Sequence, residues 1–115
     1  MDSAPQPQAT AADLKRLDLR TGKILSVEEF PEAHKPAYLL TIDLGPLGTK
    51  RTSAQVTNYP REELLGRSVV CLCNLPPRQV GPHISEVLIL GGVEPDGTVR
   101  LLQSEPECPP GTPIA

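Results

Sequence analysis

The sequence predicts an all-β fold, a small closed barrel built mostly from hairpins. Fourteen prolines and nine glycines divide the 115 residues into short segments, which favours strands and turns over long helices. Apolar residues occur in short runs bounded by turn signals, and short helix patterns interrupt them. A chain of this length has room for a single domain with one hydrophobic core.

At the N-terminus, residues 1–10 are polar and include two prolines, which is typical of a disordered tail. Thr10 and Asp13 have the spacing of a capping box and predict a short helix over residues 11–17. The single domain then occupies residues 11–115. No segment resembles a signal sequence or is long enough to span a membrane, so we expect a cytoplasmic protein without membrane insertion.

Strands in the N-terminal half are predicted at residues 24–27, 38–44 and 49–56. A Gly-Pro-Leu-Gly turn separates the last two. In the third strand Arg51, Ser53 and Gln55 share one face, whereas Lys50 begins the opposite face, which continues with smaller and apolar side chains. The polar face is either a solvent-facing surface or one half of a binding groove.

A second short helix is predicted over residues 60–66, because Pro60 suits the first helical position and Gly66 suits a left-handed cap. The strands predicted after this helix are 67–73, 85–92 and 98–102. Three strands, a helix and further strands form the pattern of the OB-fold. The predicted fold is therefore a five-stranded Greek-key barrel of this type, with short helices and terminal extensions.

Residues 69–73 and 87–90 are apolar at every position. Because a strand with one wet face alternates between apolar and polar residues, we expect both of these strands to bury both faces. A chain this short has few elements left to cover the second face. We therefore expect a homodimer, with Val87 and Ile89 at its interface.

The polar, proline-rich connector between these strands, residues 74–84, is the obvious place for a binding function. We expect a groove between the polar face of the third strand and residues 74–86. The candidate site residues, which supply cations and hydrogen-bonding groups, are Lys50, Arg51, Ser53, Gln55, Asn74, Arg78, Ser85 and Glu86.

The sequence contains no motif for catalysis, such as a nucleophile elbow or a phosphate-binding glycine loop. Cys71 and Cys73 lie on one face of a strand, as small buried thiols or as a metal pair, but no Cys-x-x-Cys or Cys/His spacing supports a metal site. We therefore predict neither catalytic residues nor a cofactor. The formal charge of −3 and the three aromatic residues argue against a generic polyanion binder with a base-stacking platform.

The segments DLRTGKI, SAQVT, NLPPR and SEVLILG, in this order and spacing, resemble CsaA, a small bacterial member of the tRNA-binding-domain superfamily. The resemblance covers roughly residues 17–114. That superfamily also includes free-standing structure-specific tRNA-binding proteins and the C-terminal domain of some methionyl-tRNA synthetases. Relatives devoted to tRNA carry Ser-x-Gly-Met where this chain has Ser85-Glu86-Val87, and the acidic residue suits the CsaA branch.

The resemblance implies a homodimeric OB-fold barrel, a chaperone activity toward unfolded or export-bound polypeptides, and a capacity to bind tRNA. The alternative is a dedicated structure-specific tRNA-binding protein. In the RNA interpretation Lys50, Arg51 and Arg78 dock the RNA backbone, with strong salt dependence. In the polypeptide interpretation side-chain amides pair with an extended chain, and the acidic net charge favours basic or apolar segments.

Overall fold

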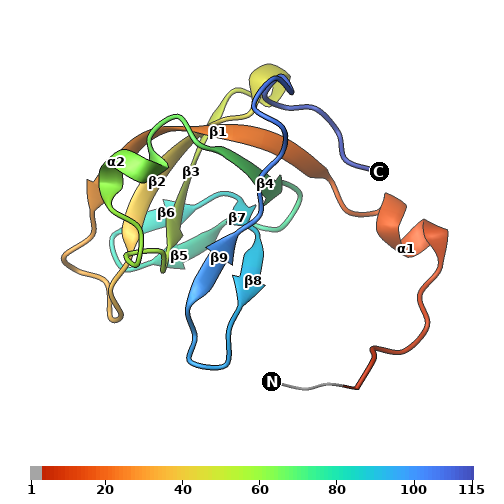
Figure 1. Cartoon of the computed structure of the whole chain (residues 1–115), viewed down its shortest axis with the longest axis horizontal. Coiled ribbons are helices and arrows are strands. Elements are labelled where there is room, and N and C mark those ends of the chain that lie inside the picture. The colour runs from red at the N-terminus through yellow and green to blue at the C-terminus, as the bar shows by residue number, and fades with distance from the viewer. Residues whose placement is uncertain (1–3) are drawn as a thin grey trace.

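The computed structural model describes residues 4–115, and residues 1–3 lie outside the described part. Five antiparallel strands form one sheet in the order β3-β2-β1-β4-β7. Their bounds are β1 (Leu19–Glu29), β2 (Tyr38–Asp43), β3 (Thr49–Ala54), β4 (Ser68–Leu72) and β7 (Leu88–Ile89). The sheet curls into a nearly closed barrel (Figure 1), which confirms the OB-type all-β fold.

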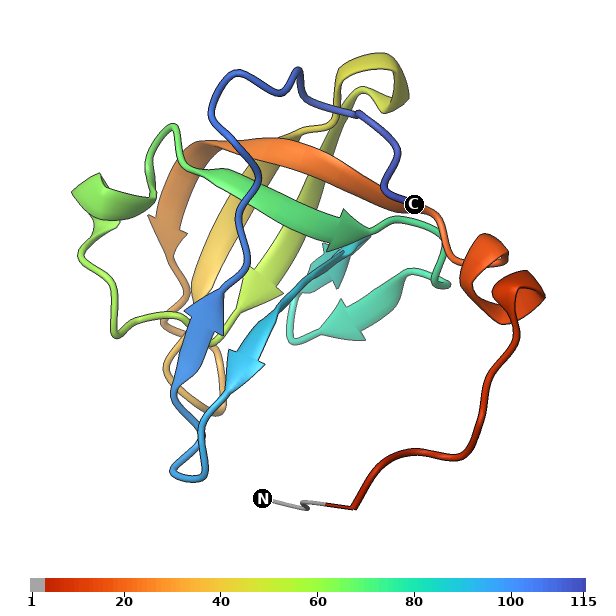
Figure 2. The same ribbon diagram turned by 45° about the vertical axis from the view of Figure 1, so that its right-hand side comes forward.

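Two small hairpins are attached to this barrel (Figure 2). The first joins β5 (Arg78–Val80) to β6 (His83–Ser85), and the second joins β8 (Gly91–Val93) to β9 (Val99–Leu101). The helical segments are short: α1 (Ala11–Lys15), the 3-10 turn η1 (Gly45–Leu47) and α2 (Arg61–Leu64). Pro60 was predicted to be the first helical residue of α2. In the structure it is the N-cap, one position earlier.

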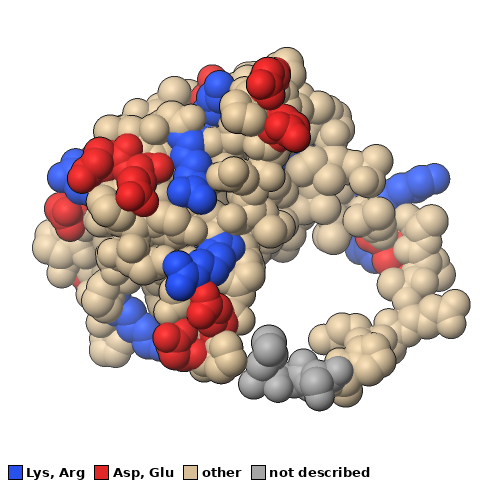
Figure 3. Space-filling model, in the orientation of Figure 1, with Lys and Arg blue, Asp and Glu red and all other residues tan. Residues whose placement is uncertain are grey.

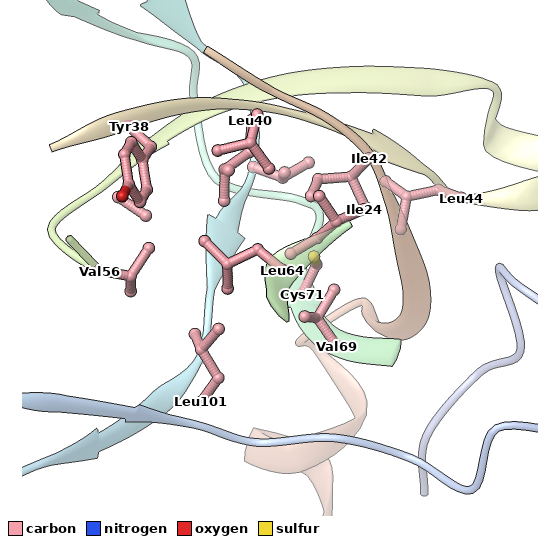
Figure 4. Close-up of a cluster of buried hydrophobic side chains, with 13 residues drawn as sticks. Ile24, Tyr38, Leu40, Ile42, Leu44, Val56, Leu64, Val69, Cys71 and Leu101 are labelled. Carbon is pink, nitrogen blue, oxygen red and sulfur yellow. The ribbon is translucent and has the colours of Figure 1, made fainter. Parts of the chain in front are cut away.

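The core fills the inside of the barrel with aliphatic side chains from every wall (Figure 4). The largest fully buried side chains are Ile24, Leu40, Ile42, Leu44, Val56, Leu64, Val69 and Cys71. Gly22 allows β1 and β2 to approach closely, because a Cβ at this position would lie only 2.7 Å from Cγ2 of Ile42. The interior of the barrel is therefore occupied by core side chains.

The polar, proline-rich connector of residues 74–84, in which no strand was predicted, contains β5 and most of β6 and forms the β5–β6 hairpin. The single strand predicted over 85–92 is also wrong, because this stretch is divided between β6, β7 and β8. Its backbone changes partner from residue to residue: Glu86 donates to Arg51 of β3, and Leu90 donates to Val70 of β4. A chain that serves several neighbours in succession has to bend, so it cannot form one straight strand.

This bend decides which side chains are buried. Val87 points into the core and is 7% exposed, whereas Leu88 is 47% exposed. Ile89 is partly buried against the core. The expectation that residues 87–90 bury both faces is therefore wrong at Leu88 within one chain.

The C-terminal tail runs along the barrel, whereas the N-terminal segment extends away from it (Figure 1). The C-terminal tail lies beside β1, where the backbone N–H of Ile114 donates to the carbonyl of Leu19 at 2.9 Å. The N-terminal residues 4–10 form no helix or strand, and they lead into α1. The Thr10–Asp13 capping box is present, which confirms that prediction. In residues 4–115, no helix has both the length and the apolar character that crossing a bilayer requires.

Candidate binding groove at the barrel seam

The barrel closes between β3 and residues 85–87 through four hydrogen bonds that involve side chains and one bond between backbone groups. The N–H of Ser53 donates to Oγ of Ser85 at 3.1 Å, and Ser85 Oγ lies 2.9 Å from Oγ1 of Thr52. The Thr52 hydroxyl donates in turn to the carbonyl of Val87 at 2.7 Å. Each hydroxyl both accepts and donates in this chain, so the polar groups of the seam are satisfied.

Glu86 completes the seam, because its backbone and its carboxylate both form hydrogen bonds with the backbone of Arg51. Its N–H donates to the carbonyl of Arg51 at 2.7 Å, while its Oε1 accepts from the N–H of Arg51 at 3.0 Å. Its Oε2 lies 3.8 Å from Nζ of Lys50. Of the predicted site residues, Lys50, Ser53, Ser85 and Glu86 therefore lie together. The side chains of Lys50, Ser85 and Glu86 make contacts within the chain, and Ser53 takes part through its backbone.

Arg51, Gln55 and Arg78 are the predicted site residues that face solvent at this seam. Within residues 4–115 neither Arg51 nor Arg78 belongs to an ion pair. Arg51 lines a cavity of about 230 Å³ between β3 and β6, and Arg78 lines a second cavity of about 120 Å³; Ser85 lines both. Two free guanidinium groups therefore flank the seam, and both can bind an anion or a backbone carbonyl.

A larger groove opens between the β5–β6 and β8–β9 hairpins, and we call it the hairpin groove. Its volume is about 760 Å³, and it reaches from the end of β3 to the loop at residues 30–37. Its walls are mainly aliphatic, with Val80, Leu88, Ile89, Val93 and Val99 among its lining residues. Sequence reasoning missed this groove because neither the β5–β6 hairpin nor the bend after Val87 was predicted.

Asn74 lines neither the two seam cavities nor the hairpin groove. It anchors the N-terminal helix. Its Oδ1 accepts from the N–H of Asp18 at 2.9 Å, and its Nδ2 donates to the carbonyl of Arg16 at 2.7 Å. The side-chain amide thereby satisfies one donor and one acceptor at the end of α1. The structure thus separates Asn74 from the other candidate residues and gives it a structural contact.

Replacing Asn74 by alanine is expected to release α1 without unfolding the barrel. Two hydrogen bonds at an exposed site are lost, so the free energy of unfolding should fall by only about 1–2 kcal/mol. Hydrogen exchange should show faster exchange at the amide of Asp18 and unchanged protection in β2. Asn74→Asp, which keeps the acceptor, should retain the protection of Asp18; loss of β2 protection in Asn74→Ala would contradict the local role.

The cysteines occupy different environments, and no group of three or more His, Cys, Asp or Glu side chains in residues 4–115 is arranged to hold a metal ion. Cys71 is buried in the core, and this burial, together with the nearby Cys73, raises the pKa of the Cys71 thiol to about 12. Burial likewise raises the pKa of Cys73, and the charge of Asp18 adds to the effect. Thiols held in the neutral form are poor nucleophiles and poor metal ligands.

The raised pKa of Cys71 predicts a loss of stability at alkaline pH. In the unfolded chain the thiol ionises around its ordinary value of 9.0, whereas the folded protein keeps it neutral up to about 12. Its contribution to the free energy of unfolding is therefore complete below pH 9 and decreases as the pH rises toward 12. Urea unfolding of wild type and Cys71→Val should show a steeper decrease over this range for wild type; parallel decreases would contradict this prediction.

Comparison with known proteins supplies the family. The tRNA binding domain family model matches residues 19–113. The chaperone CsaA of Bacillus anthracis is 47% identical in sequence and superposes with a TM-score of 0.89, covering 95% of this chain and 100% of that one. The CsaA chaperone protein of Picrophilus torridus is 43% identical, with a TM-score of 0.88, over 94% of this chain and 100% of that one.

Methionine–tRNA ligases contain the same domain as one part of a longer chain. That of Xylella fastidiosa strain M23 is 36% identical over 118 aligned residues, which are 96% of this chain and 17% of the ligase. This chain therefore spans about one sixth of the length of these curated relatives.

The fold and the family match together define a tRNA-binding domain of the β-barrel class. Within that class, the chain belongs to the CsaA family, and it matches two solved structures of that family along their whole length.

Proposed function

We propose that this protein is a homodimeric, cytoplasmic, CsaA-like chaperone that binds unfolded or export-bound polypeptide segments and retains a capacity to bind tRNA. The observation that carries the proposal is that the exposed Gln55 and Arg78 line the aliphatic hairpin groove, while the exposed Arg51 lines the neighbouring seam cavity. Side-chain amides and guanidinium groups can pair with the carbonyls of an extended chain, while the groove accepts its apolar side chains.

The tRNA capacity rests on the family and on the two free guanidinium groups. Arg51 and Arg78 line two different cavities that share Ser85, so they can contact separate phosphates of one RNA backbone. Elsewhere the charges offer less: on the face in Figure 3, basic and acidic side chains are interspersed. RNA affinity should therefore come from a few local phosphate contacts and should be sensitive to salt.

Homodimer formation is supported by aliphatic side chains that one chain leaves in contact with water. Leu88 is 47% exposed and Val93 is 63% exposed, and both lie in the same groove as Ile89. Of the two interface residues predicted from sequence, Val87 points into the core, and Ile89 remains the proposed dimer contact. A second copy that packs there would form one wall of the hairpin groove and would bury exposed apolar surface.

The second candidate function is that of a dedicated structure-specific tRNA-binding protein. This candidate is favoured by Arg51 and Arg78, which form no ion pair within residues 4–115. A cation that is not paired with a carboxylate is available to bind an RNA phosphate. Both candidates are binding functions. The ligase activity of the longer relatives is not carried over, since their similarity to this chain ends with the shared domain.

A competition titration tests the proposal and separates the candidates. Labelled tRNA and a labelled, permanently unfolded polypeptide are each titrated with the protein, alone and in the presence of the other, at low and at physiological salt. The proposal expects both to bind and to displace each other, with tRNA losing more affinity as salt rises. Binding of tRNA without any binding of the polypeptide would overturn the chaperone assignment in favour of the second candidate.

A further inference from the structure

The hairpin groove is free of negative charge, although the chain carries 14 acidic against 11 basic residues. Its lining contains no Asp or Glu, but includes Lys35, from the loop at residues 30–37, and Arg78, from β5. Both cations are exposed, and within residues 4–115 neither forms an ion pair. Of the nearby carboxylates, Glu29 lines an adjoining cavity and lies 3.8 Å from Arg61.

The local charge of a site, and not the net charge of the chain, governs the selection of a ligand that contacts the site. Charges separated by more than about 8–10 Å through solvent are largely screened at physiological salt. Two carboxylates lie next to lining residues in sequence, but Glu94 pairs with Arg100 and Asp96 accepts from the backbone N–H of Thr98. Among the residues that line the groove, Lys35 and Arg78 carry the charge. The groove should therefore favour acidic segments, whereas the net charge of −3 would suggest a preference for basic segments.

The walls of the groove indicate what accompanies the negative charge. Nucleic-acid bases bind on exposed aromatic platforms. The only carbocyclic aromatic side chain in this lining is Phe30, which is 4% exposed and packs edge-on against His83. Aliphatic walls formed by residues such as Val80, Leu88 and Val93 match aliphatic side chains better than bases.

We propose that the hairpin groove selects extended polypeptide segments that combine aliphatic residues with at least one carboxylate, and that Lys35 and Arg78 are the residues that determine this specificity. The inference rests on the proposed polypeptide-binding function and names its substrate class. The aliphatic side chains of the segment occupy the groove, and its Asp or Glu lies beside Lys35 or Arg78. Segments with Lys or Arg at that position are disfavoured by like-charge repulsion.

Three labelled peptides of equal length and identical aliphatic residues test the proposal, with Glu, Gln or Lys at the flanking positions. Fluorescence anisotropy with the full chain should rank them Glu, then Gln, then Lys, with about a tenfold span between the first and last at low salt. The span should shrink as salt rises. In the double variant Lys35→Gln/Arg78→Gln it should fall to within about twofold.

The matched control is Lys15→Gln on α1, which removes a charge outside the groove and should leave the ranking intact. Circular dichroism should show that each variant keeps the wild-type fold. Equal affinity for the Glu and Gln peptides, or tighter binding of the Lys peptide, would overturn the charge selectivity while leaving the proposed chaperone function in place. Absence of binding by all three peptides would contradict both.

Two further outcomes address other occupants of the groove. If the double variant loses tRNA affinity but its ranking of the peptides is that of wild type, the cations serve RNA and the inference fails. If Val93→Ser dissociates a dimer in sedimentation and wild type binds no peptide, a second copy fills the groove and the inference likewise fails. If Val93→Ser weakens peptide binding while its oligomeric state stays that of wild type, the result supports the inference.

Discussion

Val87→Asp is expected to unfold most of the protein. The Val87 side chain is 7% exposed and belongs to the core cluster, so the new carboxylate would be buried without a partner. An uncompensated buried charge costs more than about 4 kcal/mol, which approaches the entire stability of a typical small domain. Circular dichroism combined with urea unfolding measures the effect. The seam would also open, because the carbonyl of Val87 accepts from Thr52.

The adjacent substitution Leu88→Asp is its matched control. Leu88 is 47% exposed, so its carboxylate stays hydrated and the fold should remain, with a stability change of about 1 kcal/mol or less. Sedimentation of this variant also reports on the proposed homodimer, which a charge beside Ile89 should weaken. A folded Val87→Asp protein of nearly wild-type stability would contradict the inward orientation of Val87.

Removing both free guanidinium groups at the seam, as Arg51→Gln/Arg78→Gln, is expected to lower tRNA affinity by about tenfold or more near physiological salt. Each arginine that contacts a phosphate releases counterions, so the slope of log affinity against log salt should decrease by about one for each. Filter binding or anisotropy across a salt series measures both quantities. Arg78→Gln alone should account for about one unit of the change in slope.

The matched control is the double variant Lys15→Gln/Arg16→Gln, which removes the same net charge from the end of α1. It should retain most of the wild-type affinity and slope if the contacts are local to the seam. Equal losses in the two double variants would show that net charge alone governs RNA binding. An unchanged slope in the seam variant would remove Arg51 and Arg78 from the RNA contacts.

Local sequence patterns predicted the regular parts of this fold correctly. The alternation along β3 was right, since Thr52 and Ala54 are buried and Arg51 is exposed. The capping box of α1 was right as well. Both depend on contacts within a few residues, or on the fixed period of a strand, and the sequence encodes such contacts directly.

The candidate site was predicted only in part. Cavities lined by Arg51 and Arg78 lie between β3 and residues 75–88, and a binding role for them stays a prediction. The proposed binding roles of Ser85 and Glu86 did not anticipate that their side chains hold β3 in place. Sequence cannot distinguish these roles, because a hydroxyl or carboxylate that closes a seam looks the same as one that awaits a ligand.

By itself, the sequence determined the barrel class, the placement of most strands and the family resemblance, because these follow from periodicity, turn residues and local motifs. Only the tertiary structure decided which polar side chains are free and where the hairpin groove lies. The physical reason is that residues 85–93 pair in turn with β3, β4 and β9, so long-range hydrogen bonds orient Val87 inward and Leu88 outward. Those partners lie far away in sequence, and no local pattern records them.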